Sequence, residues 1–259
     1  MRAGRDRTRL VHGPASPGPA VRQERVLVER SGPFDGRPRS SEPRALTRLS
    51  PEESARYTML VAGVAEVVEA GLSAAVSANR LAGFDRDPPS LRFVPWRVER
   101  AAFVGRLAAM ARSHRCLVFA DVRDCYGSIR PAVVRSALAG LHAEDEACDA
   151  VEGFLDGLVR RGVRGLPVGP SPSPVLANAV LTAADRALER WRVPHLRWVD
   201  DIVVGTSERG GAERIVAGLA AVLEQVGLEL NESKTHIVVD PAGELTAPMS
   251  VAEGAMPVG

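Results

Sequence analysis

Two adjacent carboxylates, Asp200 and Asp201, lie inside the apolar and β-branched stretch LRWVDDIVVG of residues 196–205. Such stretches are typical of buried strands, where an uncompensated charge is costly. Successive side chains of a strand point to opposite faces, so one unbroken strand would direct an acid into the core. A hairpin with the acids at its tip lets both carboxylates face solvent or a cation. The pair can also be purely structural, because Asp is a common turn residue.

The elements around this hairpin predict what lies beside it. Apolar periodicity and end signals predict helices within residues 50–76, 96–113, from 131, 144–161, 173–191 and 208–227. Strands are predicted at 115–122, in both hairpin arms, around 228 and at 236–239, and a Pro-rich loop is predicted at 85–96. This order is the split βαββαβ pattern of a ferredoxin-like antiparallel sheet with helices packed on one face, an α+β fold. The strand that ends at Asp121 is then a neighbour of the hairpin, so Asp121 should lie beside Asp200.

Three carboxylates that converge at a sheet edge repel one another, and in apolar surroundings only a bound cation would neutralise them. Oxygen ligands suit Mg²⁺, for which Mn²⁺ can substitute, usually with substrate phosphates completing the coordination. Two such ions about 3.5 to 4 Å apart stabilise the attacking and leaving oxygens of phosphoryl transfer. Asp121, Asp200 and Asp201 are therefore candidate ligands of a two-metal site.

Composition limits the class of protein. The 259 residues carry a net charge of +1, so any nucleic-acid binding must be local rather than a property of the whole surface. Apolar runs are too short to span a membrane and no signal peptide is evident, which predicts a cytoplasmic protein. The three cysteines and five histidines lack the spacing of a zinc site or a disulfide framework.

The two ends of the chain differ from its middle. Residues 1–50 carry 11 Arg against 5 acidic residues, are rich in Pro and Gly, and lack sustained periodicity. We expect a disordered basic leader there, which either contacts phosphate backbone or is only a solvated tail. Residues 241–259 are expected to be a flexible tail.

Four segments carry motifs in a fixed order: FADVRDCYGSI at 119–129, LPVGPSPSPVLAN at 166–178, WVDD at 198–201 and GLELNESKT at 227–235. They resemble the first palm motif, the LPQGxxxSPxLxN segment, the YxDD box and the GLxLNxxKT segment of bacterial reverse transcriptases. That family includes retron and group II intron enzymes, and unclassified members of which some are linked to antiviral defence. The resemblance extends from about Ser73 to Val239.

The resemblance implies an RNA-directed DNA polymerase that takes deoxynucleotides, an RNA template and a DNA or RNA primer. Residues 115–240 would form the polymerase palm and residues 51–114 a partial, helical fingers-like region. Only about 20 residues follow the last palm strand, too few for the thumb that grips the primer duplex. Either the chain is a fragment, or a protein or noncoding RNA partner supplies that grip.

Carried over to this sequence, the resemblance implies that Asp121 and Asp200 hold both metals, that the Val122 carbonyl is a further ligand, and that Asp201 supports them. Lys234, the single lysine beside 32 arginines, stands where the family places a lysine near the departing pyrophosphate. A lysine can deliver a proton there and an arginine cannot. The alternative is an exposed lysine that only neutralises a nearby glutamate, either Glu229 or Glu232.

The substrate contacts implied by the resemblance are less specific. Tyr126 occupies the sugar-gate position, where a ring fills the space of a ribose 2′-hydroxyl, although aromatic residues are more often packing. The backbone at Pro167 and Gly169 would approach the incoming base and template, and Arg80 the triphosphate. The phosphate-backbone candidates, which a solvated helix end explains almost as well, are Arg160, Arg161 and Arg164.

Two departures from the family pattern bear on activity. Val168 replaces a Gln near the nucleotide, and Trp198 replaces the Tyr of the YxDD box. Val168 and the short C-terminal region favour an alternative, a palm that binds nucleic acid but polymerises weakly or not at all. A nucleotide cyclase would share the palm sheet and the two-metal mechanism. However, a cyclase binds no template, so it would not need the 166–178 segment, and this argues against that class.

Overall fold

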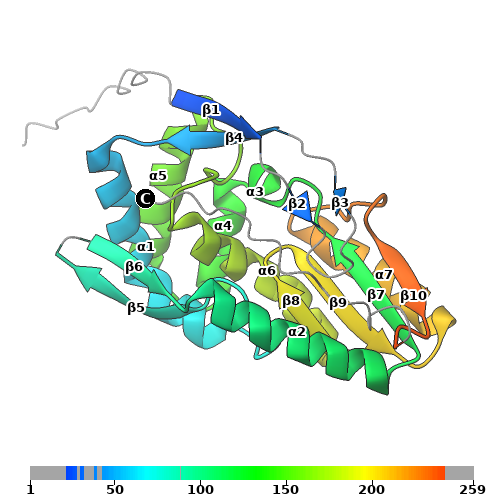
Figure 1. Ribbon diagram of the computed structural model, residues 1–259. Coiled ribbons are helices and arrows are strands. Elements are labelled where there is room, and N and C mark those ends of the chain that lie inside the picture. The colour runs from blue at the N-terminus through cyan, green and yellow to red at the C-terminus, as the bar shows by residue number, and fades with distance from the viewer. Residues whose placement is uncertain (1–21, 28–29, 32–37, 40–42, 88, 243–259) are drawn as a thin grey trace, which may run out of the picture.

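The computed structural model describes residues 22–27, 30–31, 38–39, 43–87 and 89–242 (Figure 1). Its helices are α1 Pro51–Gly71, α2 Trp96–Ser113, α3 Cys125–Ser128, α4 Pro131–Gly140, α5 Asp145–Val159, α6 Ser173–Arg190 and α7 Arg209–Gln225. Its strands are β1 Arg22–Leu27, β2 Arg30–Ser31, β3 Pro38–Arg39, β4 Pro43–Arg48, β5 Leu81–Arg86, β6 Pro89–Phe93, β7 Cys116–Asp121, β8 His195–Trp198, β9 Asp201–Thr206 and β10 His236–Val239. The flexible tail expected over 241–259 lies almost entirely outside the described residues.

A four-stranded antiparallel sheet forms the centre, with the strands in the order β10-β7-β9-β8. This is the order that the split βαββαβ pattern predicts. The predicted hairpin is confirmed, because β8 pairs with β9 through a short turn that contains Asp200. In the register of β7 with β9, Asp121 lies opposite Asp201 rather than Asp200.

Helices cover both faces of this sheet, so the prediction of helices on one face is wrong. On one face α7 contacts β7, β9 and β10. On the other face α2 packs on the sheet through a cluster of Phe103, Leu107, Met110, Ala111, Leu117, Leu196 and Val203. Alternate residues of β7 join opposite clusters, Leu117 with α2 and Val118 with the main core. The continuous apolar run of this strand is typical of burial on both faces, a signal that the sequence contained.

The remaining helices form one pack with the main core, in which α1 contacts α5 and α6, and α4 contacts α5 and α6. Helix α1 begins as predicted, with a capping box between Ser50 and Glu53 and a proline at its first position. Helix α7 ends at Gln225, and Gly227 shortly after it has a φ of +70°, the left-handed conformation that glycine commonly adopts after the end of a helix. Within the described residues, none of the helices combines the length and apolarity needed to cross a membrane.

The prediction of a disordered leader is wrong for the described part of residues 1–50. Strand β1 pairs antiparallel with β4, and the Thr47 N–H donates to the Val168 carbonyl at 2.8 Å. The predicted Pro-rich loop at 85–96 is instead the β5–β6 hairpin followed by the start of α2. Both predictions failed for the same reason. A short strand is stabilised by pairing with its partner strand, so its own sequence need not show an alternating apolar pattern.

Candidate active site

The acidic hairpin presents its carboxylates at one end of the central sheet. Asp121, at the last position of β7, is only 3% exposed, whereas Asp200 and Asp201 are partly exposed. The Val122 N–H donates to the Asp200 carbonyl at 3.3 Å, which joins the end of β7 to the turn. Val199, just before the acids, has a φ of +56°, a conformation that is strained for a β-branched residue.

The segment after α7 folds back beside these acids. Leu230 forms an isolated antiparallel bridge with Val122, and the Asn231 N–H donates to the Asp121 carbonyl at 2.7 Å. The Lys234 Nζ then lies 3.3 Å from Asp121 Oδ1 and 3.5 Å from Oδ2. Glu229, one of the two glutamates considered as a partner of this lysine, lies 3.7 Å from Arg123 instead. The lysine therefore pairs with the acid at the centre of the candidate site.

Carboxylate oxygens at the end of an apolar sheet are the donors that Mg²⁺ and Mn²⁺ prefer. Asp121 and Asp201 lie opposite one another in the strand register, and Asp200 precedes Asp201. Among the described residues, however, no three Asp, Glu, His or Cys side chains are grouped closely enough to form a complete metal site. By donor type and location the residues fit divalent cations, and metal binding itself is a proposal.

Tyr126 lies in the short helix α3, five residues after Asp121, and is partly buried against the main core. Its carbonyl accepts a hydrogen bond from the Leu166 N–H at 2.8 Å. Gly165 has a φ of +58°, and a Cβ added there would lie 2.3 Å from the Tyr126 carbonyl oxygen. The backbone of Tyr126 is thus held directly against the loop that contains Pro167 and Gly169.

This loop is fixed from two further sides. The Ser173 hydroxyl, completely buried, donates to the Pro167 carbonyl at 2.6 Å and lies 3.1 Å from the hydroxyl of Tyr57 in α1. Gly169 has a φ of +114°, which favours glycine, and a Cβ added there would lie 3.7 Å from Leu46 Cδ2 of β4. Sequence reasoning did not single out Tyr57, because an aromatic residue at helical spacing reads as ordinary core packing.

Arg80 is held by two glutamates on different helices. Its Nε donates to Glu69 at 2.6 Å, and its backbone N–H donates to Glu99 at 2.8 Å. Burial raises the pKa of the Glu99 carboxyl, although the hydrogen bonds from the Arg80 and Asn79 N–H groups oppose the shift. The arginine expected at the triphosphate is therefore already engaged in an ion pair.

The three phosphate-backbone candidates lie around the end of α5. Arg161 pairs with Glu53 and Arg164 pairs with Asp124, the latter at 3.0 Å. Arg160 is exposed and lines a cleft of about 440 Å³ between α1 and α5, together with Arg56 and Phe154. Of the three, only Arg160 has no ion pair among those of the described residues.

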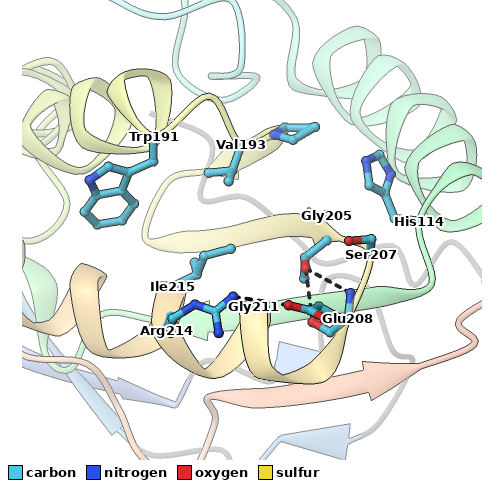
Figure 2. A pocket seen from close by; sticks show the side chains of 11 residues that line it. His114, Trp191, Val193, Gly205, Ser207, Glu208, Gly211, Arg214 and Ile215 are labelled. Carbon is cyan, nitrogen blue, oxygen red and sulfur yellow. Dashed lines mark hydrogen bonds and ion pairs between the residues drawn. The ribbon is translucent and has the colours of Figure 1, made fainter.

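A second cavity, of about 550 Å³, lies at the other end of β9, away from the acids (Figure 2). Trp191 and His114 line it, and Arg214 and Glu208 form an ion pair at 3.2 Å across its floor. None of the residues expected from the sequence to act in a site lies in this cavity.

The sequence did not single out two arginines close to the acids. Arg197 lies within the hairpin, in β8, and is completely buried. Arg100 of α2 lies 5.6 Å above the ring of Trp198, and burial lowers the pKa of its guanidinium while nearby Asp201 opposes that shift. For Arg197 the sequence did contain a signal, because a charged residue inside an apolar strand needs a buried partner.

Comparison with known proteins agrees with the motifs. A family described as "Reverse transcriptase (RNA-dependent DNA polymerase)" matches residues 75–249, about two thirds of the chain, and the chain belongs to this family. The retron Mx65 reverse transcriptase of Myxococcus xanthus is 27% identical over 167 residues, which cover 58% of this chain and 38% of that protein. The chain thus spans about two fifths of the length of the curated relative. Among solved structures, telomerase from Candida albicans in complex with a TWJ fragment of telomeric RNA matches with a TM-score of 0.40 and 14% identity, over 53% of this chain and 30% of that chain.

The close approach of Gly165 to Tyr126 predicts a specific loss of stability. Gly165→Ala should lower the free energy of unfolding by roughly 2 to 4 kcal/mol, because it adds backbone strain and a steric overlap with a carbonyl oxygen. Gly162 is a matched control, since its φ is +95° but nothing lies within 4 Å of an added Cβ. Gly162→Ala should therefore cost only about 1 kcal/mol by urea denaturation. Equal costs for the two variants would contradict the contact.

Proposed function

We propose that this chain is an RNA-directed DNA polymerase that adds deoxynucleotides to the 3′-hydroxyl of a DNA or RNA primer on an RNA template. The observation that carries the proposal is the group formed by Asp121, Asp200, Asp201 and Lys234 at one end of the sheet. Membership of the reverse transcriptase family supports it, as does the likeness to a retron reverse transcriptase.

In this proposal Asp121 and Asp200 hold two Mg²⁺ ions, with the Val122 carbonyl as a further ligand and Asp201 in support. The ions, when bound, supply charge stabilisation for the attacking and leaving oxygens. Lys234 provides the proton for the departing pyrophosphate, from a position already next to Asp121. The chain therefore orients the acids with backbone bonds and keeps a proton donor beside them.

The nucleotide would lie between α3 and the loop of residues 165–169. Tyr126 would exclude a ribose 2′-hydroxyl, and the hydrogen bond from the Leu166 N–H to its carbonyl restrains the backbone that carries the ring. The backbone at Pro167 and Gly169 would face the base and template. Arg80 would reach the triphosphate only by exchanging its pairing with Glu69 for the phosphates.

The larger assembly is also part of the proposal. Residues 115–240 act as the palm and residues 51–114 as a partial fingers region, while a protein or noncoding RNA supplies the thumb function. Arg160, Arg161 and Arg164 would contact phosphate backbone, with Arg160 the most available of the three. A second candidate function, a palm that binds nucleic acid but polymerises weakly, is favoured by Val168 in place of the family's Gln.

The central test removes one acid. Asp200→Ala should reduce Mg²⁺- or Mn²⁺-dependent deoxynucleotide incorporation on a primed RNA template by at least about a thousandfold, because charge stabilisation at the reacting oxygens is lost. Glu232→Ala, which removes an exposed acid nearby, should stay within about twofold of the wild type. Primer extension by the Asp200→Ala protein at the wild-type rate would refute the assignment.

The sugar-gate role predicts a change in selectivity. Tyr126→Ala should lower the ratio of kcat/KM for deoxynucleotides over ribonucleotides by about ten- to a hundredfold, because the space of the 2′-hydroxyl opens. Tyr126→Phe keeps the ring and should keep the ratio. If Tyr126→Ala leaves this ratio unchanged, the residue serves packing only.

Proton donation by Lys234 can be separated from its charge. Lys234→Arg keeps a cation for Asp121 but cannot release a proton, so single-turnover incorporation should fall about ten- to a hundredfold with little change in nucleotide affinity. The measurement is rapid-quench primer extension, with Lys234→Ala as the comparison. Full activity of the Arg variant together with loss in the Ala variant would show that the position supplies charge alone.

A further inference from the structure

Arg197, three residues before Asp200, is completely buried in β8, and its guanidinium makes five hydrogen bonds. Its Nε and Nη2 donate to both carboxylate oxygens of Asp185 in α6, at 2.7 to 3.1 Å. Its Nη1 donates to Asn178 Oδ1 at 2.8 Å and to the Val199 carbonyl at 3.0 Å. One side chain thus joins the long helix α6 to the turn that carries the acids.

Stability alone does not account for a buried ion pair of this kind. Burial would raise the pKa of Asp185, yet the charge of Arg197 holds that pKa below its usual range, so the acid is ionised inside the core. Replacing a buried ion pair with apolar residues of similar volume is often neutral or stabilising. An apolar side chain could not reproduce the hydrogen bonds to Asn178 and to the Val199 carbonyl, and the second of these reaches the turn that carries the acids.

That hydrogen bond acts on the strained residue of the turn. Val199 has a φ of +56°, and this conformation costs a β-branched residue of order 1 to 3 kcal/mol, so it persists only where the surrounding structure holds it. The carbonyl that Arg197 holds belongs to the peptide bond between Val199 and Asp200. Its orientation therefore sets the direction in which the Asp200 backbone leaves the turn.

The donor is itself held from a second side. Asn178, which shares Nη1 of Arg197, donates from its Nδ2 to the Ala78 carbonyl at 3.1 Å. The backbone of Arg197 pairs with the same segment, since its N–H donates to Ala75 and its carbonyl accepts from Ser77, both at 3.0 Å. Movement of the guanidinium is therefore blocked by α6, by the 75–78 segment and by the strand itself.

We propose that Arg197, held by Asp185 and Asn178, is a positioning residue that fixes the Val199–Asp200 turn and through it the carboxylates of Asp200 and Asp201. The effect on incorporation rests on the proposed polymerase function. The effect on the turn does not, because it is a property of the protein alone.

Two variants weaken the network in different ways. Arg197→Lys keeps a buried cation for Asp185, but one ammonium group cannot also satisfy Asn178 and the Val199 carbonyl. Asn178→Ala leaves the arginine in place and removes its second support, so it remains informative if Arg197→Lys fails to fold. Thr182→Ala is the matched control. Thr182 lies one turn further along α6 and is 5% exposed, and among the described residues its hydroxyl bonds only to Ala179 of the same helix.

The first measurement is amide hydrogen exchange in the free protein. In both network variants the amides of residues 199–202 should exchange at least about tenfold faster, while peptides from α5 keep their wild-type rates. The second measurement is single-turnover incorporation against Mg²⁺ concentration, where the half-maximal concentration should rise about ten- to a hundredfold. Thr182→Ala should change neither quantity.

A rescue variant tests the turn directly. Glycine adopts positive φ without steric cost. Adding Val199→Gly to the Arg197→Lys protein should therefore bring the half-maximal Mg²⁺ concentration part of the way back to the wild-type value. Absence of any rescue would contradict the role of the Val199 carbonyl.

Failure of this proposal is distinguishable from failure of the proposed function. If the wild type extends primers and the network variants match it in both exchange and Mg²⁺ dependence, the positioning role is refuted and the polymerase function stands. If the wild type does not extend primers but residues 199–202 exchange faster in the variants, the positioning of the turn is supported and the polymerase function fails.

Discussion

The repulsion between like charges at the end of an apolar sheet is the constraint on which the rest of this structure depends. Asp121 and Asp201 lie opposite one another in adjacent antiparallel strands, where like charges are destabilising. Both faces of these strands are buried, so the acids can stand only at the strand ends. Lys234 offsets part of the repulsion at Asp121, Arg100 lies near Asp201, and backbone hydrogen bonds add further restraint.

That restraint comes from bonds that do not involve the carboxylates. The Val122 N–H and the Asn231 N–H tie the end of β7 to the turn and to the returning chain. Arg197 holds the turn from behind, and α2 covers its other side through Trp198, whose ring meets Phe103 edge-on at 5.6 Å. An acid held by several elements keeps its position when a cation or a substrate changes the local charge.

Much of this arrangement could be predicted from the sequence. The hairpin and the long helices follow from local periodicity and from the constraint on two adjacent acids, and the strand order follows from the split βαββαβ pattern. The face covered by α2 was missed because helical spacing shows that a helix has an apolar side but does not show which sheet face it meets. The partner of Lys234 was missed for a similar reason, since Glu229 and Glu232 are near it in sequence and Asp121 is near it only in space.

The loop of residues 165–169, which we propose faces the nucleotide, shows why this side of the candidate site could not be predicted from local sequence. Its conformation depends on Thr47 in β4, on Tyr57 in α1 through Ser173, and on Tyr126 in α3. Thr47 and Tyr57 are more than a hundred residues from the loop, and nothing in their own neighbourhoods marks them as functional. Glycine adopts positive and negative φ about equally well, so the local sequence does not specify the positive φ of Gly165 and Gly169, and these distant contacts select it. A substitution at Thr47 or Tyr57 would therefore act on the backbone at Pro167 and Val168 before it acted on the acids.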